Sequence, residues 1–178
     1  MLVRLFGASA LALGLFASPA SAQENDVLAP ARAGQLQCFE PNVANKTCAS
    51  LGGYSFAADG AIQNVAEILI MPSPLIVMRV SAPVTVRNNA VCGPLSAADI
   101  DRATFTVGGA LATVEEATQI KAAMQQQLAP MIDVETCMTL TPNGDVLRAD
   151  TTLGGTPRPD LSQRVIWVGA NDGYRVAP

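Results

Sequence analysis

The chain has 178 residues, with 11 Lys and Arg against 15 Asp and Glu, and it contains no histidine. Without histidine it cannot form a Ser-His-Asp or Cys-His catalytic site or an HExxH zinc site. Its formal net charge of -4 and its lack of a basic run argue against nucleic acid as a partner, because binding a phosphate backbone requires clustered positive charge.

Residues 1–22 have the three zones of a secretory signal peptide. Arg4 precedes an apolar run over residues 5–16, and residues 20–22 are small enough for the pocket of a signal peptidase. The apolar run is shorter than the ~20 residues that cross a bilayer, and no cysteine for a lipid anchor lies near the cleavage point. We therefore predict cleavage after Ala22, no membrane span in the mature chain, and a periplasmic or secreted location.

The mature chain is predicted to consist of a tail followed by one domain. Residues 23–34 are mostly Ala, Pro and polar residues without periodicity, which predicts a flexible N-terminal tail. Residues 35–178 have the length of one ordinary domain, and we expect them to fold around a single core.

Turn residues divide the first half of this domain into predicted strands. Asp59-Gly60 supplies a turn that tolerates positive φ and closes a first hairpin, and Ala82-Pro83 separates the two strands that follow. The strands predicted in this half span residues 51–56, 61–71, 75–80 and 84–86.

Two helices are predicted in the middle of the chain. Ser96 stands at the N-cap position of a short helical turn over residues 97–102. Thr113 and Glu116 form a capping box at the start of one longer amphipathic helix. The apolar stripe of that helix consists of Val114, Ala117, Ile120, Met124, Leu128 and Met131.

The second half of the domain again alternates strands with turns, at Gly108-Gly109 and at Asn143-Gly144. The strands predicted here span residues 105–107, 110–111, 134–141, 146–153, 164–168 and 174–176. Successive hairpins and one long helix predict an α+β domain, in which a curved antiparallel sheet packs against that helix.

The four cysteines, an even number in an exported chain, predict two structural disulfide bonds. Three pairings are possible. We favour Cys38 with Cys48, which closes a short loop, and Cys92 with Cys137, which joins two distant segments. A thiol catalyst or metal site is the alternative, but it lacks support, because there is no Cys-x-x-Cys pair and no histidine. We therefore predict no metal and no cofactor.

Carboxylates are the remaining catalytic candidates, since paired acids hydrolyse glycosidic bonds when they face each other across a cleft. Asp99 with Asp101, and Glu115 with Glu116, are close neighbours in the sequence. Both pairs fall in the first turn of a predicted helix, where acids commonly complement the helix dipole. We therefore interpret them as helix-stabilising residues and predict no catalytic residue.

One candidate interaction surface lies near the C-terminus, on a predicted hairpin around the turn at residues 171–173. Aromatic and Arg side chains are enriched at interaction hot spots. Trp167 also has a plain interpretation as a core residue, because it lies in an apolar strand. The candidate surface consists of Arg164, Trp167, Asp172, Tyr174 and Arg175.

Cysteines, turns and strand residues recur in short motifs along the mature chain. They are Gly34-x-Leu36-x-Cys38, Lys46-Thr47-Cys48, Tyr54-x-Phe56 before Asp59-Gly60, Val91-Cys92-Gly93 and Asp172-Gly173-Tyr174-Arg175. This combination resembles a group of small exported proteins of alphaproteobacteria. The resemblance implies a periplasmic location and supplies no catalytic or binding residue.

The sequence favours a non-enzymatic module that binds an envelope protein or a small ligand, because catalytic ingredients are sparse and a disulfide-braced sheet offers a stable platform. One alternative is a carboxylate-dependent hydrolase of envelope carbohydrate, which requires two buried acids ~5 to 10 Å apart across a cleft. Another is a structural or secreted envelope protein. An exposed apolar patch or a free sheet edge would favour partner binding over that alternative.

Overall fold

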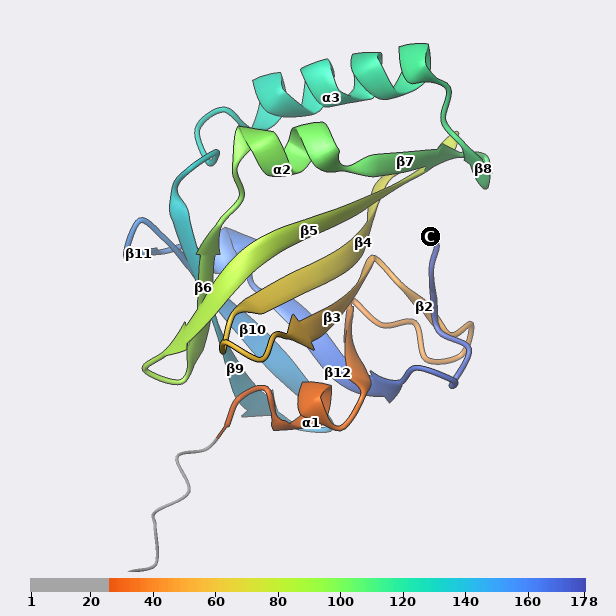
Figure 1. Cartoon of the computed structure of the whole chain (residues 1–178). Helices are drawn as coiled ribbons and strands as arrows, with labels where there is room; N and C mark the ends of the chain where they lie inside the picture. Colours follow the sequence, from red (N-terminus) through yellow and green to blue (C-terminus); the bar gives the residue numbers. More distant parts are fainter. Residues whose placement is uncertain (1–25) are drawn as a thin grey trace, which may run out of the picture.

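The computed structural model describes residues 26–178, and its main feature is a closed β-barrel (Figure 1). Of the described residues, 51% lie in strands and 18% in helices. Eight antiparallel strands follow one another in the order β4-β3-β1-β12-β10-β9-β6-β5, and β5 also pairs with β4, which closes the barrel. The signal peptide predicted for residues 1–22 lies outside the described residues.

The elements have the following bounds. The barrel strands are β1 (Gln35–Phe39), β3 (Ser50–Phe56), β4 (Ile62–Pro72), β5 (Leu75–Arg87), β6 (Ala90–Pro94), β9 (Glu135–Asn143), β10 (Val146–Leu153) and β12 (Gln163–Gly169). The shorter strands are β2 (Thr47–Cys48), β7 (Thr104–Val107), β8 (Ala110–Leu111), β11 (Thr156–Pro157) and β13 (Arg175–Val176). The helices are α1 (Ala29–Arg32), α2 (Ala97–Arg102) and α3 (Val114–Leu128), with a 3-10 turn η1 (Pro159–Leu161).

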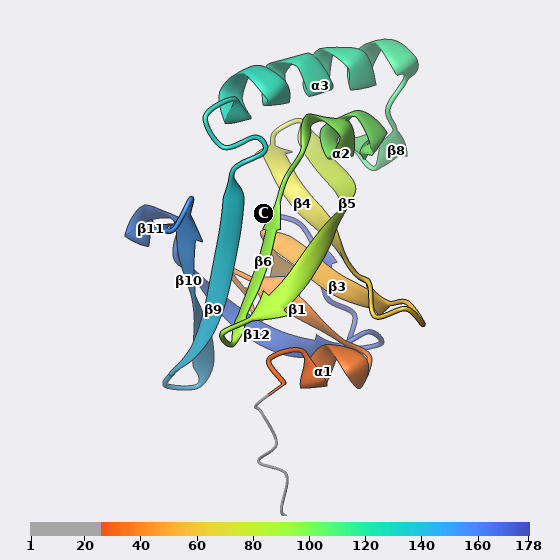
Figure 2. The same cartoon turned by 60° about the vertical axis from the view of Figure 1, so that its left-hand side comes forward.

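The predicted α+β fold, an antiparallel sheet packed against one long helix, is wrong. The hairpins β3–β4, β7–β8 and β9–β10 form as predicted, but pairings such as β1–β12 and β6–β9 join strands far apart in the sequence. These pairings curl the sheet until its two edges meet. Because a closed sheet buries its own inner face, α3 is not needed as a cover and packs at one end of the barrel instead (Figures 1 and 2).

One long strand, β5, replaces the two strands predicted at residues 75–80 and 84–86. It pairs with β4 at residues 75–84, and on its other edge with β7 at residues 76–79 and then with β6 at residues 85–87. Pro83 lies between those two segments, where that edge of β5 has no partner strand. A proline is tolerated there because no ladder hydrogen bond on that edge needs its missing N–H.

The helices α2 and α3 close one end of the barrel, as both figures show. The helix α3 begins at the predicted capping box of Thr113 and Glu116. The helix α2 begins at the predicted N-cap Ser96, which in the structure forms a capping box with Asp99. Together with β7, these two helices pack against β4 and β5 and enclose an apolar cluster. Its buried members are Ala66, Ile76, Met78, Val80, Ile100, Ala103, Phe105 and Met124. No helix within residues 26–178 is long and apolar enough to cross a membrane.

The opposite end of the barrel is closed by α1, which was predicted to belong to a flexible tail. Leu28, directly before this helix, is fully buried, and Ala31 is 8% exposed. They pack against Val91 and Trp167 at the barrel end. The tail prediction is therefore corrected for residues 26–34: a single turn of helix is too short to show periodicity, yet its burial fixes it in place.

The two disulfides have the favoured pairing, Cys38 with Cys48 and Cys92 with Cys137. The first anchors a small outer layer, in which β2 pairs in parallel with β13 against the barrel wall. The hairpin predicted at the C-terminus does not form. The β12 strand pairs with β1 at residues 165–169 and with β10 at residues 163–165, and after Gly169 the chain leaves the barrel, where β13 pairs with β2 instead of returning along β12.

Candidate functional site

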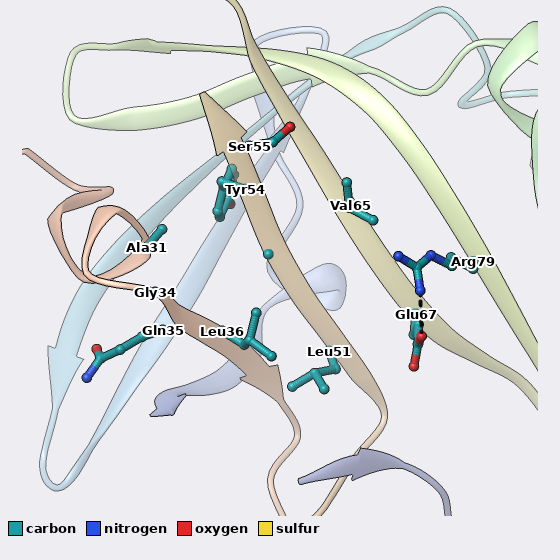
Figure 3. Close-up of a pocket in the computed structure, with 11 residues that line it drawn as sticks. Ala31, Gly34, Gln35, Leu36, Leu51, Tyr54, Ser55, Val65, Glu67 and Arg79 are labelled. Carbon is teal, nitrogen blue, oxygen red and sulfur yellow. Dashed lines mark hydrogen bonds and ion pairs between the residues drawn. The ribbon is translucent and has the colours of Figure 1, made fainter. Parts of the chain in front are cut away.

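Two open hollows adjoin on the outer wall of the barrel, and we call their combined surface the two-hollow face. The first, of about 370 Å³, extends from α1 across β1, β3 and β4 (Figure 3). The second, of about 400 Å³, lies over β4, β5, β7 and the C-terminal strand β13. Glu67 and Arg79 line both hollows and form the wall between them.

The alternation of each strand places these side chains outside the barrel. Gln37 is 1% exposed, Ala66 9% and Val80 8%, so these residues face inward. Their neighbours Leu36, Val65, Glu67 and Arg79 must then face outward, since successive side chains of a strand point to opposite faces. The first hollow thus has an apolar floor, which Figure 3 shows as Leu36, Leu51 and Val65 beside the ion pair.

A glycine keeps this floor open. Gly53 lies on β3 beside Leu36, and a Cβ atom added to Gly53 would come within 3.0 Å of Leu36 Cδ2. That distance is shorter than an ordinary van der Waals contact, so a larger residue here would displace Leu36 and fill part of the first hollow.

The electrostatics of the two-hollow face are locally positive. Arg79 Nη1 lies 3.4 Å from Glu67 Oε1, and their side chains are 64% and 43% exposed. Arg175 is exposed on β13 and lines the second hollow. None of the ion pairs found within residues 26–178 includes Arg175. Two guanidinium groups therefore face one carboxylate, in a chain whose net charge is -4.

The five residues of the predicted C-terminal surface are not gathered on one hairpin. Trp167 pairs in register with the buried Gln37 and packs inside the barrel end, which agrees with its interpretation as a core residue. Arg164 binds Glu40 on the outer wall, with its Nε 3.0 Å from Glu40 Oε2. Arg175 is the member of the set that lines the second hollow.

The other two members of that set have local structural contacts. A carboxylate oxygen of Asp172 accepts a hydrogen bond of 2.7 Å from the backbone N–H of Gly169, which fixes the turn after β12. Tyr174 packs against the cluster that contains Cys38 and Cys48. The structure thus assigns both residues a role in holding the outer layer.

The predicted acid pairs are also placed by the structure. Asp99 is 2% exposed, and no other Asp or Glu within residues 26–178 is buried. Burial alone would raise the pKa of Asp99, but hydrogen bonds from Ser96 and the ion pair with Arg102 hold this pKa below the ordinary value. Asp101 and Glu115 are exposed, so neither faces Asp99 as a buried second acid.

Glu116 completes the capping box of α3. Its carboxylate accepts hydrogen bonds from the backbone N–H and the hydroxyl of Thr113, at 2.8 and 2.9 Å. These bonds lower the pKa of Glu116 from its ordinary value. Within the described part of the chain, no group of three or more Cys, Asp or Glu residues is arranged to hold a metal ion.

A buried polar pair lies just inside the barrel wall at the first hollow. The Tyr54 hydroxyl donates a 2.9 Å hydrogen bond to Gln37 Oε1. Burial raises the pKa of Tyr54 well above its ordinary value, and the bond to Gln37 offsets only part of that effect. Tyr54 therefore acts as a neutral donor, and Gln37 Nε2 has no partner within residues 26–178.

Sequence reasoning did not select Glu67 or Arg79, although a signal was present. Each is a single charge in a predicted apolar strand, and the turn between the two strands places them directly opposite each other. Leu36 and Leu51 could not be assigned to the site in the same way, because their outward direction depends on barrel closure.

Comparison of the chain with protein families, with curated proteins and with solved structures finds no match.

Proposed function

We propose that this protein is an exported, non-enzymatic binding module of the cell envelope, and that its ligand site is the two-hollow face. The observation that carries the proposal is the wall that the hollows share. Because Glu67 and Arg79 line both, a ligand that fills one hollow reaches the other. The two disulfides support an oxidising compartment such as the periplasm, where such bonds form and persist.

The ligand we propose is an extended segment of an envelope protein. The face crosses the neighbouring strands β1, β3, β4, β5 and β7. At ~4.8 Å per strand this is about 19 Å, the length of roughly six extended residues. Both hollows are open, so the polar backbone of a peptide can stay hydrated while its side chains enter them. Polar side chains at the rim, such as Ser55 and Thr106, offer hydrogen bonds.

Charge selects among such segments. Arg79 makes one ion-pair contact within residues 26–178, at 3.4 Å, which leaves most of its five N–H donors available, and Arg175 also lines the second hollow. We therefore propose a segment with apolar residues at its ends and an acidic residue between them. The hydrolase alternative gains no support, since it requires a second buried acid opposite Asp99.

The proposal is tested with a peptide array of six-residue segments, probed with the fluorescently labelled mature chain. The array holds apolar ends constant and places Asp, Asn or Lys at the centre. We expect the Asp series to bind best. We expect Arg79→Glu to weaken its binding about tenfold or more, since a hydrogen bond to a charged group contributes ~1.5 kcal/mol.

The matched control is Arg148→Glu. Arg148 is similarly exposed on the barrel wall, but it pairs with Asp150 away from both hollows. If binding falls equally in both variants, the loss is explained by the change in net charge alone, and the two-hollow face is rejected as the ligand site. Equal binding of the Asp and Lys series would reject the proposed acidic segment.

Mass analysis of the protein purified from periplasm tests export, with Gln23 as the expected first residue.

A further inference from the structure

The two disulfides differ in their exposure to solvent. Cys38 and Cys48 are 0% and 1% exposed, beneath the outer layer formed by β2 and β13. Cys92 is 2% exposed, but its partner Cys137 is only partly buried. Both Cys92 and Cys137 line a third hollow of about 380 Å³ on the barrel wall. A dissolved thiol therefore has access to one sulfur of the second bond and to neither sulfur of the first.

The second bond also joins strands that are held together without it. Cys92 and Cys137 lie directly opposite each other on β6 and β9, within a ladder of paired residues from Ala90 to Pro94. The β6 strand additionally pairs with β5. The barrel wall can thus remain closed when this sulfur bond opens. By contrast, the Cys38–Cys48 bond closes a loop whose β2 strand has a two-residue ladder with β13.

Charged side chains surround the accessible sulfur. Arg87 Nη2 lies 3.8 Å from Cys137 Sγ, and Glu135 Oε2 lies 3.9 Å from the same sulfur. Arg87 and Glu135 also form an ion pair with each other. A nearby guanidinium attracts an approaching thiolate and stabilises thiolate charge on sulfur, whereas the carboxylate opposes both effects.

We propose that the Cys92–Cys137 bond is a thiol–disulfide exchange site, and that Cys137 is the sulfur at which an external thiol enters. The co-reactant is a thiol of the compartment, either a small thiol or an exposed dithiol of a protein. This inference does not depend on the proposed function.

The reaction balances in two steps. The external thiolate attacks Cys137 Sγ, a new sulfur–sulfur bond forms to Cys137, and the Cys92 sulfur leaves as a thiolate that takes a proton from water. A second thiolate, either the other sulfur of a dithiol or a second molecule of a small thiol, then attacks the external sulfur of the mixed disulfide, and Cys137 leaves as a thiolate that takes a proton from water. Two electrons pass from the dithiol or from the two small thiols, which become a disulfide, to this protein, which gains two thiols.

The test compares the two disulfides within one folded molecule. The mature protein is incubated with reduced glutathione under native conditions, trapped with N-ethylmaleimide at intervals, and digested for peptide mass analysis. We expect Cys92–Cys137 to open about tenfold or more faster than Cys38–Cys48, with the transient glutathione adduct on Cys137. Circular dichroism of the same samples reports whether the fold persists.

Two single substitutions are expected to change the opening rate of the Cys92–Cys137 bond in opposite directions. Arg87→Gln is expected to slow the opening several-fold and Glu135→Gln to accelerate it, because each alters the charge at Cys137 Sγ. Arg148→Gln, distant from this sulfur, is the control and should leave the rate unchanged. The proposal is overturned if both disulfides open at one rate together with loss of the fold, if the adduct forms on Cys92, or if Arg87→Gln and Arg148→Gln behave alike.

Discussion

The two ends of the barrel are closed by segments of very different size. At one end the six-residue α2 and the 15-residue α3 pack with β7 over an apolar cluster. At the other, α1 has four residues. Yet Leu28 at the small end and Ile100 at the large end are both 0% exposed. The burial of a few side chains, rather than the length of the closing element, therefore determines how firmly an end is held.

The largest expected effect is at the large end. Phe105 is 2% exposed in the centre of its cluster. We expect Phe105→Ala to lower the free energy of unfolding by about 4 kcal/mol, through lost burial and an unfilled cavity. Urea unfolding measures this free energy. Phe105→Leu keeps most of the side-chain volume and should lower the free energy of unfolding much less. Equal losses in the two variants would contradict a cavity effect.

The second prediction tests whether the small end is comparably tight. Leu28→Ala should lower the free energy of unfolding by about 3 kcal/mol, although the residue precedes a single helical turn. Leu111, 76% exposed on β8, provides the matched control, and Leu111→Ala should change stability by less than about 0.5 kcal/mol. If Leu28→Ala lowers the free energy of unfolding as little as Leu111→Ala does, α1 contributes little to stability and the small end is not held as firmly as the large end.

A third prediction concerns the polar pair that distinguishes the small end. Tyr54→Phe removes the hydroxyl bound to Gln37 Oε1 and leaves both polar atoms of a buried amide without a described partner. We expect a loss of about 2 kcal/mol in chemical unfolding. Tyr174→Phe serves as the control, because no hydrogen bond of the Tyr174 hydroxyl is found within residues 26–178. A neutral Tyr54→Phe would show that the pair is dispensable.

The smallest expected effect is the pH response of the large end. Since the folded pKa of Asp99 lies below its unfolded value of about 3.9, its contribution is complete above that pH and is lost as pH falls through the folded pKa. Asp99→Asn should reduce stability by about 1 kcal/mol near pH 6 and flatten the decline below pH ~4. Unfolding measured from pH 6 to 2 checks this, and an unchanged acid slope would contradict it.

Sequence reasoning succeeded where a structure is determined by residues close together in the chain. The capping boxes at Ser96 and Thr113 satisfy backbone N–H groups three residues away, and the Asn143-Gly144 turn joins adjacent strands, so each is visible in a short window. The favoured disulfide pairing likewise joins cysteines that are consecutive in the chain.

The remaining features depend on contacts that no short window contains. Gln35 pairs with Gly169 to join β1 to β12, and only this closure turns Trp167 inward and Leu36 outward. Leu28 and its neighbour Val27 are too few to show a helical period in a largely polar segment, and the burial of Leu28 depends on the barrel end that it covers. The two-hollow face was missed although β1, β3, β4 and β5 pair in chain order, because the outward direction of their side chains depends on closure and the second hollow also needs β7 and the return of β13.

The consecutive pairing of the cysteines also bears on biosynthesis. In a chain that enters an oxidising compartment N-terminus first, Cys38 and Cys48 emerge together and can be joined while the rest of the chain is still in transit. Cys137 then meets Cys92 as the only remaining thiol. If the chain is exported as we propose, an oxidase that joins cysteines in order of arrival produces both native bonds directly, without an isomerase to correct mispaired intermediates.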